Sequence, residues 1–199
     1  MNTKTSLRKT SPLLHLAAFG CASAMLATSA SAAFHLWTIR ELFTNLDGSL
    51  QFIELSTTSG SQQFVNAQQI QVKDQSNTTT HTFAIPANLP SDSANKTFIL
   101  ATAGVQAAGG PAPDFTIPSN FLFAAGGTIN FFGTNTGLVY TALPTDGITS
   151  HAIPGNTNQV NSPKNFAGST GQVVPEPGTW ALLGMGGAGL CALLRRRQA

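Results

Sequence analysis

Short runs of apolar or alternating residues recur along the middle of this 199-residue chain, and turn residues separate them. Apolar residues do not repeat at helical spacing over more than about two turns, so the pattern is not typical of a helical domain. It predicts an all-β, immunoglobulin-like sandwich over residues 33–155. The seven expected strands are Leu36–Phe43, Gln51–Ser56, Gln69–Lys73, Thr80–Ile85, Thr97–Thr102, Gly127–Phe132 and Leu138–Ala142.

The second expected strand also predicts which of its side chains share a face. Successive side chains of a strand point to opposite sides of the sheet. Phe52 and Glu54 therefore belong to one face. Ile53 and Leu55 belong to the other. A turn over residues 45–48 precedes this strand, because its glycine accepts a positive φ at little cost.

Two stretches of the chain lack this strand pattern. Residues 103–120 are rich in Gly, Ala and Pro, and we expect a long loop there. Residues 156–173 have almost no apolar periodicity. We expect this second stretch to be a flexible spacer that follows the domain.

An uncharged apolar segment, Trp180 to Leu194, lies near the end of the sequence and is followed by three arginines. A helix of fifteen residues spans about 22 Å, which is short against a hydrocarbon core of about 30 Å. Its glycines weaken the helix further. The segment therefore predicts a single transmembrane helix over residues 180–194 that anchors the chain weakly, with the arginines on the cytoplasmic side.

Residues 174–197 resemble the PEP-CTERM sorting signal of Gram-negative bacteria. The resemblance lies in Val-Pro-Glu-Pro, a Thr-Trp pair, a short hydrophobic helix and a basic end, in that order. It implies processing near the Pro-Glu-Pro by an exosortase, a membrane transpeptidase-like enzyme. An ordinary membrane anchor that is never cut is the alternative. The residues that carry the signal are Val174, Pro175, Glu176, Pro177, Thr179, Trp180, Arg195, Arg196 and Arg197.

Residues 1–32 have the pattern of a secretory signal peptide. Three basic residues precede the apolar run from Leu13 to Leu26. Ala30 and Ala32 form the small-x-small site that signal peptidase cuts, which leaves Ala33 as the first mature residue. Cys21 offers a lipoprotein alternative, but Phe19 before it is too bulky for a lipobox.

Removal of both ends changes the charge of the chain. Four basic and seven acidic residues remain in the middle, which gives a net charge of −3. Without a basic stripe, nucleic-acid binding is not expected. Both cysteines, Cys21 and Cys191, lie in the end segments, so the mature domain has neither a disulfide nor thiolate chemistry.

Two short motifs in the middle of the chain resemble the opening of a lamin-tail domain, and a third resembles the motif that often ends it. The first runs from Trp37 to Asn45 and contains Ile-x-Glu, and the second is Gln51-Phe52-Ile53-Glu54-Leu55. The third, Asn161-Ser162-Pro163, resembles the end of that domain. The resemblance covers residues 35–167 and implies an immunoglobulin-like accessory module of secreted bacterial proteins. The usual Gly-Trp after the second strand is missing, and Val65-Asn66-Ala67 stands nearby instead.

Candidate catalytic residues do not form a recognisable constellation in the sequence. His35, His81 and His151 lie far apart and lack metal-ligand spacing. Glu41 and Glu54 lie on adjacent expected strands and could serve glycoside hydrolysis if about 5–10 Å apart in a cleft. The alternative is structural: either carboxylate pairs with a neighbouring arginine or caps a strand end. We expect no enzyme activity and no cofactor or metal.

Two further residue sets admit a binding role or a structural one. Asp47 and Asp74 could contribute oxygens to a Ca²⁺ site, but aspartates at such positions are usual in turns. Aromatic residues could form an exposed platform on which polysaccharide stacks, and core packing is the alternative. These aromatic residues are Trp37, Phe115, Phe121, Phe123, Phe131 and Phe132.

The sequence as a whole indicates an exported, non-enzymatic protein. We expect a transient anchor in the inner membrane, followed by release to the cell surface or extracellular matrix of a Gram-negative bacterium. The expected partners are signal peptidase, an exosortase-like enzyme and exopolysaccharide, as in a biofilm. The alternatives are a secreted module that binds a glycan or a protein, and a cell-surface enzyme that acts on polysaccharide.

Overall fold

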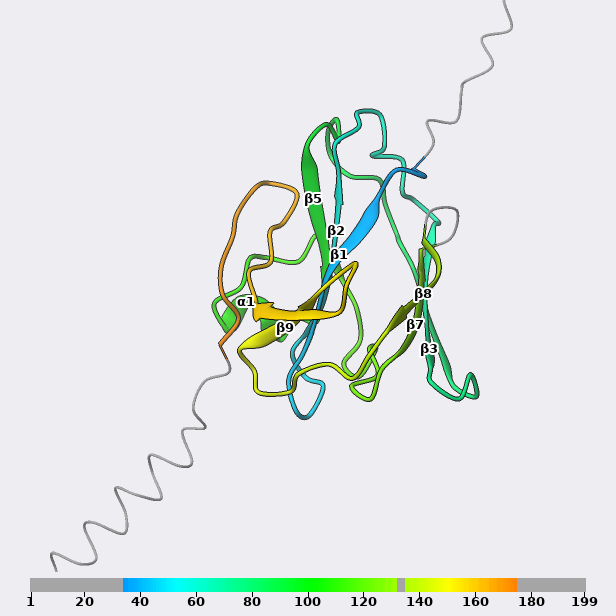
Figure 1. The fold of residues 1–199 in the computed structure, drawn as a ribbon. Coiled ribbons are helices and arrows are strands. Elements are labelled where there is room, and N and C mark those ends of the chain that lie inside the picture. Colours follow the sequence, from blue (N-terminus) through cyan, green and yellow to red (C-terminus); the bar gives the residue numbers. More distant parts are fainter. Residues whose placement is uncertain (1–33, 132–134, 175–199) are drawn as a thin grey trace, which may run out of the picture. The chain divides into compact units, whose positions relative to one another are not determined.

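A computed structural model describes residues 34–131 and 135–174, which form an all-β domain of two sheets with one very short helix. Figure 1 shows the two sheets as separate layers. The expected signal peptide and the apolar segment 180–194 lie outside the described residues. Within the described ranges, every helix is too short or too polar to cross a membrane.

The larger sheet contains six strands, in the order β10-β9-β1-β2-β5-β6. Its neighbouring strands are antiparallel except β5 and β6. The strands are β1 (Thr38–Thr44), β2 (Gln51–Thr57), β5 (Lys96–Ala101), β6 (Phe115–Thr116), β9 (Thr149–Ala152) and β10 (Thr157–Val160).

The smaller sheet is an antiparallel layer with the order β4-β3-β7-β8. Its strands are β3 (Gln69–Asp74), β4 (Thr80–Ala84), β7 (Gly127–Phe131) and β8 (Asn135–Tyr140). The helix, α1 (Gly104–Ala107), lies on the side of the six-stranded sheet that faces away from β3, β7 and β8 (Figure 1).

Strands occur at all seven places where the sequence predicts them, with ends that differ by a few residues. The sequence pattern misses β9 and β10, because β9 buries Ser150 and His151 and β10 is an exposed edge strand. The expected loop 103–120 contains α1 and β6. Neither is longer than four residues, so neither has room for a visible period.

The main hydrophobic core lies between the two sheets and contains large, fully buried side chains from both. Trp37 meets Phe98 edge to face, with 4.7 Å between the ring centroids. Ile53 and Leu55 of β2 point into this core, as their alternation predicts. This burial explains why the two sheets stay together.

A second hydrophobic cluster lies on the opposite, outer face of the six-stranded sheet. Phe43 and Phe52 stack there, with 5.2 Å between ring centroids and 14° between the ring planes. The position of Phe52 confirms the predicted face. Buried residues of this cluster are Phe43, Phe52, Ile99, Ala101, Val105 and Val173.

The flexible spacer expected over residues 156–173 needs correction, because this stretch is part of the folded domain. It contains β10 and most of residues 161–174, which we call the C-terminal loop. Asn161, Phe166 and Val173 are buried. This stretch is polar and contains Pro and Gly, so its sequence shows no apolar periodicity. Its backbone is nevertheless held by side chains of the sheet beneath it. The domain therefore extends to residue 174 and not to 155.

Candidate functional site

Glu41 and Glu54 face each other across β1 and β2, on the outer face of the six-stranded sheet. A β-bulge causes this arrangement: the register shifts between Ile39 and Glu41, so Arg40 is an extra residue. Simple alternation would place Glu41 on the inner face with Ile39. The bulge reverses that, and both carboxylates become buried, with exposed fractions of 3% and 9%.

Both glutamates bind backbone N–H groups of the C-terminal loop. Glu41 Oε1 accepts a hydrogen bond from the Ser162 N–H at 3.1 Å, and from the Ser150 hydroxyl at 2.6 Å. Glu54 Oε2 accepts one from the Lys164 N–H at 2.7 Å. Both carboxylates thus bind the chain's own backbone, and the charge of Arg40 also lowers the pKa of Glu54.

A third acidic residue, Asp114, continues this row. Its Oδ2 accepts hydrogen bonds from the Phe166 N–H at 3.0 Å and from the Ile99 N–H at 2.8 Å. Residues 162, 164 and 166 therefore each donate to a carboxylate of the domain. In an extended segment every second N–H group points the same way. The three carboxylates therefore bind one side of this segment, as the edge of a neighbouring strand would.

Burial opposes the ionisation of all three carboxylates. It raises the pKa of Glu54 to about 7, while the Lys164 N–H lowers this pKa and the nearby charge of Glu41 raises it. Burial likewise raises the pKa of Glu41 and of Asp114, against the hydrogen bonds that they accept. The pair Glu41 and Glu54 therefore keeps a proton at pH values well above the usual pKa range of a carboxyl group.

A polar pocket of about 320 Å³ opens beside the two glutamates. It is lined by β1, β2, β9 and β10 and by the start of the C-terminal loop, including Arg40, Gln159 and Ser162. Glycoside hydrolysis uses two carboxyl groups, one with a raised pKa and one that is ionised, whereas burial raises the pKa of both Glu41 and Glu54. Here, however, oxygens of both groups already accept bonds from the loop.

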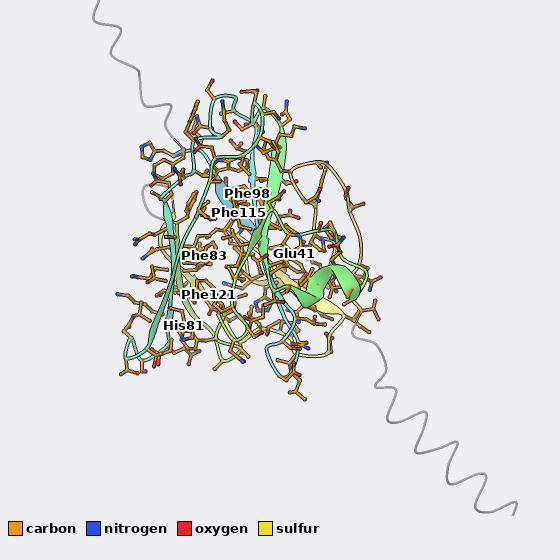
Figure 2. The ribbon with its side chains drawn as sticks, turned by 180° about the vertical axis from the view of Figure 1, so that it is seen from behind. Glu41, His81, Phe83, Phe98, Phe115 and Phe121 are labelled. Carbon is orange, nitrogen blue, oxygen red and sulfur yellow. The ribbon has the colours of Figure 1, made fainter. Side chains whose placement is uncertain are left out.

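None of the three histidines of the described domain shares a strand with this pair, and His151 of β9 lies opposite Leu42, the residue after Glu41. Figure 2 labels Glu41 and His81, which belong to opposite sheets. The His81 ring stacks on Phe123 at 4.5 Å between centroids, and its Nδ1 lies 2.9 Å from the Phe121 carbonyl oxygen. His151 is buried in β9, and burial lowers its pKa. His35 is exposed before β1.

Acidic clusters of the metal-binding kind are not found among the described residues: no three His, Cys, Asp or Glu side chains converge there. The candidate Ca²⁺ residues occupy turns. Asp47 Oδ1 accepts bonds from the Ser49 hydroxyl and N–H, which lower the pKa of Asp47. Asp74 accepts bonds from the N–H groups of Thr78 and Thr79. Their oxygens thus close local turns.

The aromatic residues of the second half form the core and not an exposed platform. Trp37, Phe115, Phe121 and Phe131 are each at most 8% exposed. Phe123 is partly buried against the same core, and Phe132 lies outside the described residues. The four buried side chains therefore offer no flat surface to a sugar ring.

The predicted sorting residues meet the described structure at Val174. Its N–H donates to the Ala108 carbonyl oxygen at 2.8 Å, and its side chain is 45% exposed. Outside the described residues lie Ala30, Ala32, Pro175, Glu176, Pro177, Thr179, Trp180, Arg195, Arg196 and Arg197.

Sequence reasoning missed Asp114 and Asn161 as residues that hold the C-terminal loop. Asn161 belongs to the Asn-Ser-Pro motif, which was the available signal for its role. Asp114 lies in a Pro-rich stretch without any such signal. Its role depends on the contact with Phe166, which is 52 residues away in the sequence.

Comparison with curated proteins and with solved structures finds no match. Residues 173–197 match the family model described as the PEP-CTERM protein-sorting motif. This motif implies an exported protein whose C-terminal signal anchors it in a membrane and is processed by an exosortase-type membrane enzyme. The chain therefore carries a PEP-CTERM sorting motif, and its first two residues, Val173 and Val174, belong to the folded β domain.

Proposed function

We propose that this chain is a non-enzymatic surface or matrix protein of a Gram-negative bacterium, associated with exopolysaccharide in a biofilm. Signal peptidase removes residues 1–32, and the segment 180–194 holds the chain briefly in the inner membrane. An exosortase-type enzyme then cuts near the Pro-Glu-Pro. The observation that carries this proposal is the sorting motif joined directly to a folded domain.

The acidic residues of the site already accept hydrogen bonds within the domain, and this supports a structural role for it. Glu41, Glu54 and Asp114 all accept hydrogen bonds from the chain's own backbone. A general acid or a nucleophile must instead present its oxygen to a substrate. The buried aromatic side chains also favour a packed module over a cleft-bearing enzyme.

We assign the domain to the immunoglobulin-like, lamin-tail type within this proposal. Its three characteristic motifs meet at one place, since Glu41 of the first and Glu54 of the second bind the loop that begins with the third, Asn161-Ser162-Pro163. The loop of the third motif thus binds the first two motifs, although it lies more than a hundred residues further along the chain.

Intact-mass analysis of the secreted protein tests the export and sorting part of the proposal. The expected species begins at Ala33 and lacks Arg195 to Ala199. Changing Glu176 and Pro177 to Ala should retain the tail and the membrane anchor, whereas the control Gln172→Ala, at an exposed position, should be processed normally. A secreted wild-type species that keeps the arginines would contradict the proposal.

Sedimentation with purified exopolysaccharide tests the matrix role. The processed protein should co-sediment with the polymer from the same bacterium, and an unrelated exported β protein should stay in the supernatant. Equal recovery of both proteins in the supernatant would point to the alternative, a module that binds another protein.

The polar pocket favours one second candidate, an enzyme that acts on polysaccharide. Its two carboxyl groups share one pocket, and the pKa of Glu54 of about 7 suits a general acid. Release of reducing sugar by the secreted protein, lost in both Glu41→Gln and Glu54→Gln, would establish this activity. Release that persists in both variants would come from another source.

A further inference from the structure

The sorting motif does not begin in free chain: its first residue is part of the domain. The family match starts at residue 173, and the Val173 side chain is fully buried. It packs in the outer hydrophobic cluster with Phe43, Phe52 and Val105. The recognised signal and the folded domain therefore overlap in sequence.

Asn161 holds the backbone of Val173 from both sides. The Val173 N–H donates to Asn161 Oδ1 at 2.7 Å, and Asn161 Nδ2 donates to the Val173 carbonyl oxygen at 2.8 Å. One residue further on, Val174 donates to the Ala108 carbonyl oxygen. Because the Asn161 side chain is 1% exposed, its two hydrogen bonds to Val173 are shielded from water.

Close backbone contact adds to this attachment. A Cβ atom built on Gly171 would lie 2.2 Å from the Gly109 carbonyl oxygen. Only a residue without a side chain fits this approach. Together with the three carboxylates under residues 162, 164 and 166, these contacts fix the C-terminal loop at its two ends and along its first half.

The Pro-Glu-Pro follows this attachment without any linker. Residues 175–177 come directly after Val174, so even an extended chain places Pro177 only about 10 Å beyond the last anchored residue. Enzymes that cut a peptide chain act on segments that are locally open, and a folded segment must open first. The residues on the amino side of the motif are hydrogen-bonded and, at Val173, buried.

We infer that the C-terminal loop is a latch, and that residues 171–174 must leave the domain before the processing enzyme can cut the motif. Local opening then limits the rate of processing. The inference rests on the proposed function, in which an exosortase-type enzyme processes the Pro-Glu-Pro. It adds that the domain itself regulates this step through Asn161, Ala108 and Gly109.

Two variants loosen the latch at different atoms. Asn161→Ala removes both hydrogen bonds to Val173 and a third to the Ile148 carbonyl oxygen. Gly171→Ala forces its methyl group against the Gly109 carbonyl oxygen. Gln172→Ala is the matched control, because this neighbouring side chain is exposed. Pulse-chase labelling with intact-mass detection in the producing bacterium measures how fast the tail is lost.

Both loosened variants should lose the tail several-fold to about tenfold faster than the wild type, as expected when contacts that hold a closed state are weakened. The control should match the wild type. Hydrogen exchange at residues 171–174 should quicken in both variants while exchange in β2 stays unchanged, which shows that the domain remains folded.

A linker variant gives an independent test that leaves the latch intact. Six Gly and Ser residues inserted between Val174 and Pro175 move the motif away from the docked loop. This chain should be processed as fast as the loosened variants, and adding Asn161→Ala should change its rate no further.

The outcomes separate the latch from the proposed function. Equal or slower processing of the loosened and linker variants would overturn the latch, while loss of the tail in the wild type would still support sorting. Retention of the tail in the wild type and in every variant would overturn both. Loss of the tail that Glu176→Ala does not affect would also overturn both.

Discussion

Glu54 is a residue whose ionisation the fold opposes, and this gives the domain a defined pH dependence. Its pKa rises from 4.5 to about 7 on folding, mainly because the side chain is buried. A pKa that is higher in the folded state stabilises the fold fully below the unfolded value. That stability is then lost as the pH rises towards 7. Burial of Glu54 thus contributes stability in mild acid that is lost at neutral pH.

Glu54→Gln should remove most of this pH dependence. The wild-type free energy of unfolding should fall by about 3 kcal/mol between pH 4.5 and 7 because of Glu54, using about 1.36 kcal/mol for each pKa unit. Glutamine cannot ionise, and its carbonyl oxygen can still accept the Lys164 N–H. Thermal unfolding of the secreted protein at pH 5 and pH 8 measures the effect, and the variant should show a smaller difference in Tm.

Asp92→Asn is the matched control for this measurement. Asp92 is exposed, and N–H groups led by that of Ser61 lower its pKa. Its contribution is therefore lost only below its usual range, so the Tm difference between pH 5 and 8 should equal that of the wild type. A Glu54→Gln variant with the full wild-type difference would show that Glu54 is not the titrating group.

Individual strands show where sequence patterns suffice and where they fail. Alternation placed Phe52 correctly opposite to Ile53 and Leu55, because β2 is regular between its two partners. The same rule fails in β1, since the extra residue Arg40 reverses the faces of everything after it. A bulge has no composition signal of its own here, so the position of Glu41 could not be predicted from the sequence.

Deletion of Arg40 should be tolerated, in contrast to deletions elsewhere in β1. Without it, Glu41 follows Ile39 directly and still faces Glu54, so the alternation becomes regular. We expect a loss of about 1–3 kcal/mol, partly because the Arg40 carbonyl oxygen accepts the Ile153 N–H. Circular dichroism during thermal unfolding measures this.

Deletion of Leu42 provides the contrast for that prediction. It would turn the rest of β1 over, moving Phe43 from the outer cluster into the core. This chain should give no cooperative unfolding transition. Similar behaviour of the two deletions would mean that the bulge does not set the faces of β1.

Some features of the whole chain can be predicted from the sequence, and others cannot. The sorting motif was recognised because its residues are contiguous, and a contiguous pattern needs no knowledge of folding. The end of the domain could not be recognised in this way. Residues 161–174 are held by Glu41, Glu54 and Asp114, which lie far away in the sequence. Interactions of that range leave no local period in a polar segment.

Shortening the mature chain tests where the domain ends. A chain of residues 33–174 should unfold cooperatively with the Tm of the processed protein. A chain of residues 33–160 should lose several kcal/mol of stability, because it lacks Phe166 and Val173, each worth about 1.5–3 kcal/mol of burial. It also leaves Glu41 and Glu54 without their N–H donors. Equal Tm values for the two chains would mean that residues 161–174 are not part of the domain.

The bonds between β1 and the C-terminal loop also set the order in which this protein can mature. Glu41 and Ser162 are 121 residues apart, and β1 pairs with β9 as well as with β2. A chain that is threaded through a translocation channel with its amino end first exposes β1 early, yet Glu41 cannot bind the C-terminal loop until residue 162 has emerged. In the maturation proposed above, the apolar segment 180–194 follows closely, so these last contacts of β1 would form at about the time when the chain is held in the bilayer.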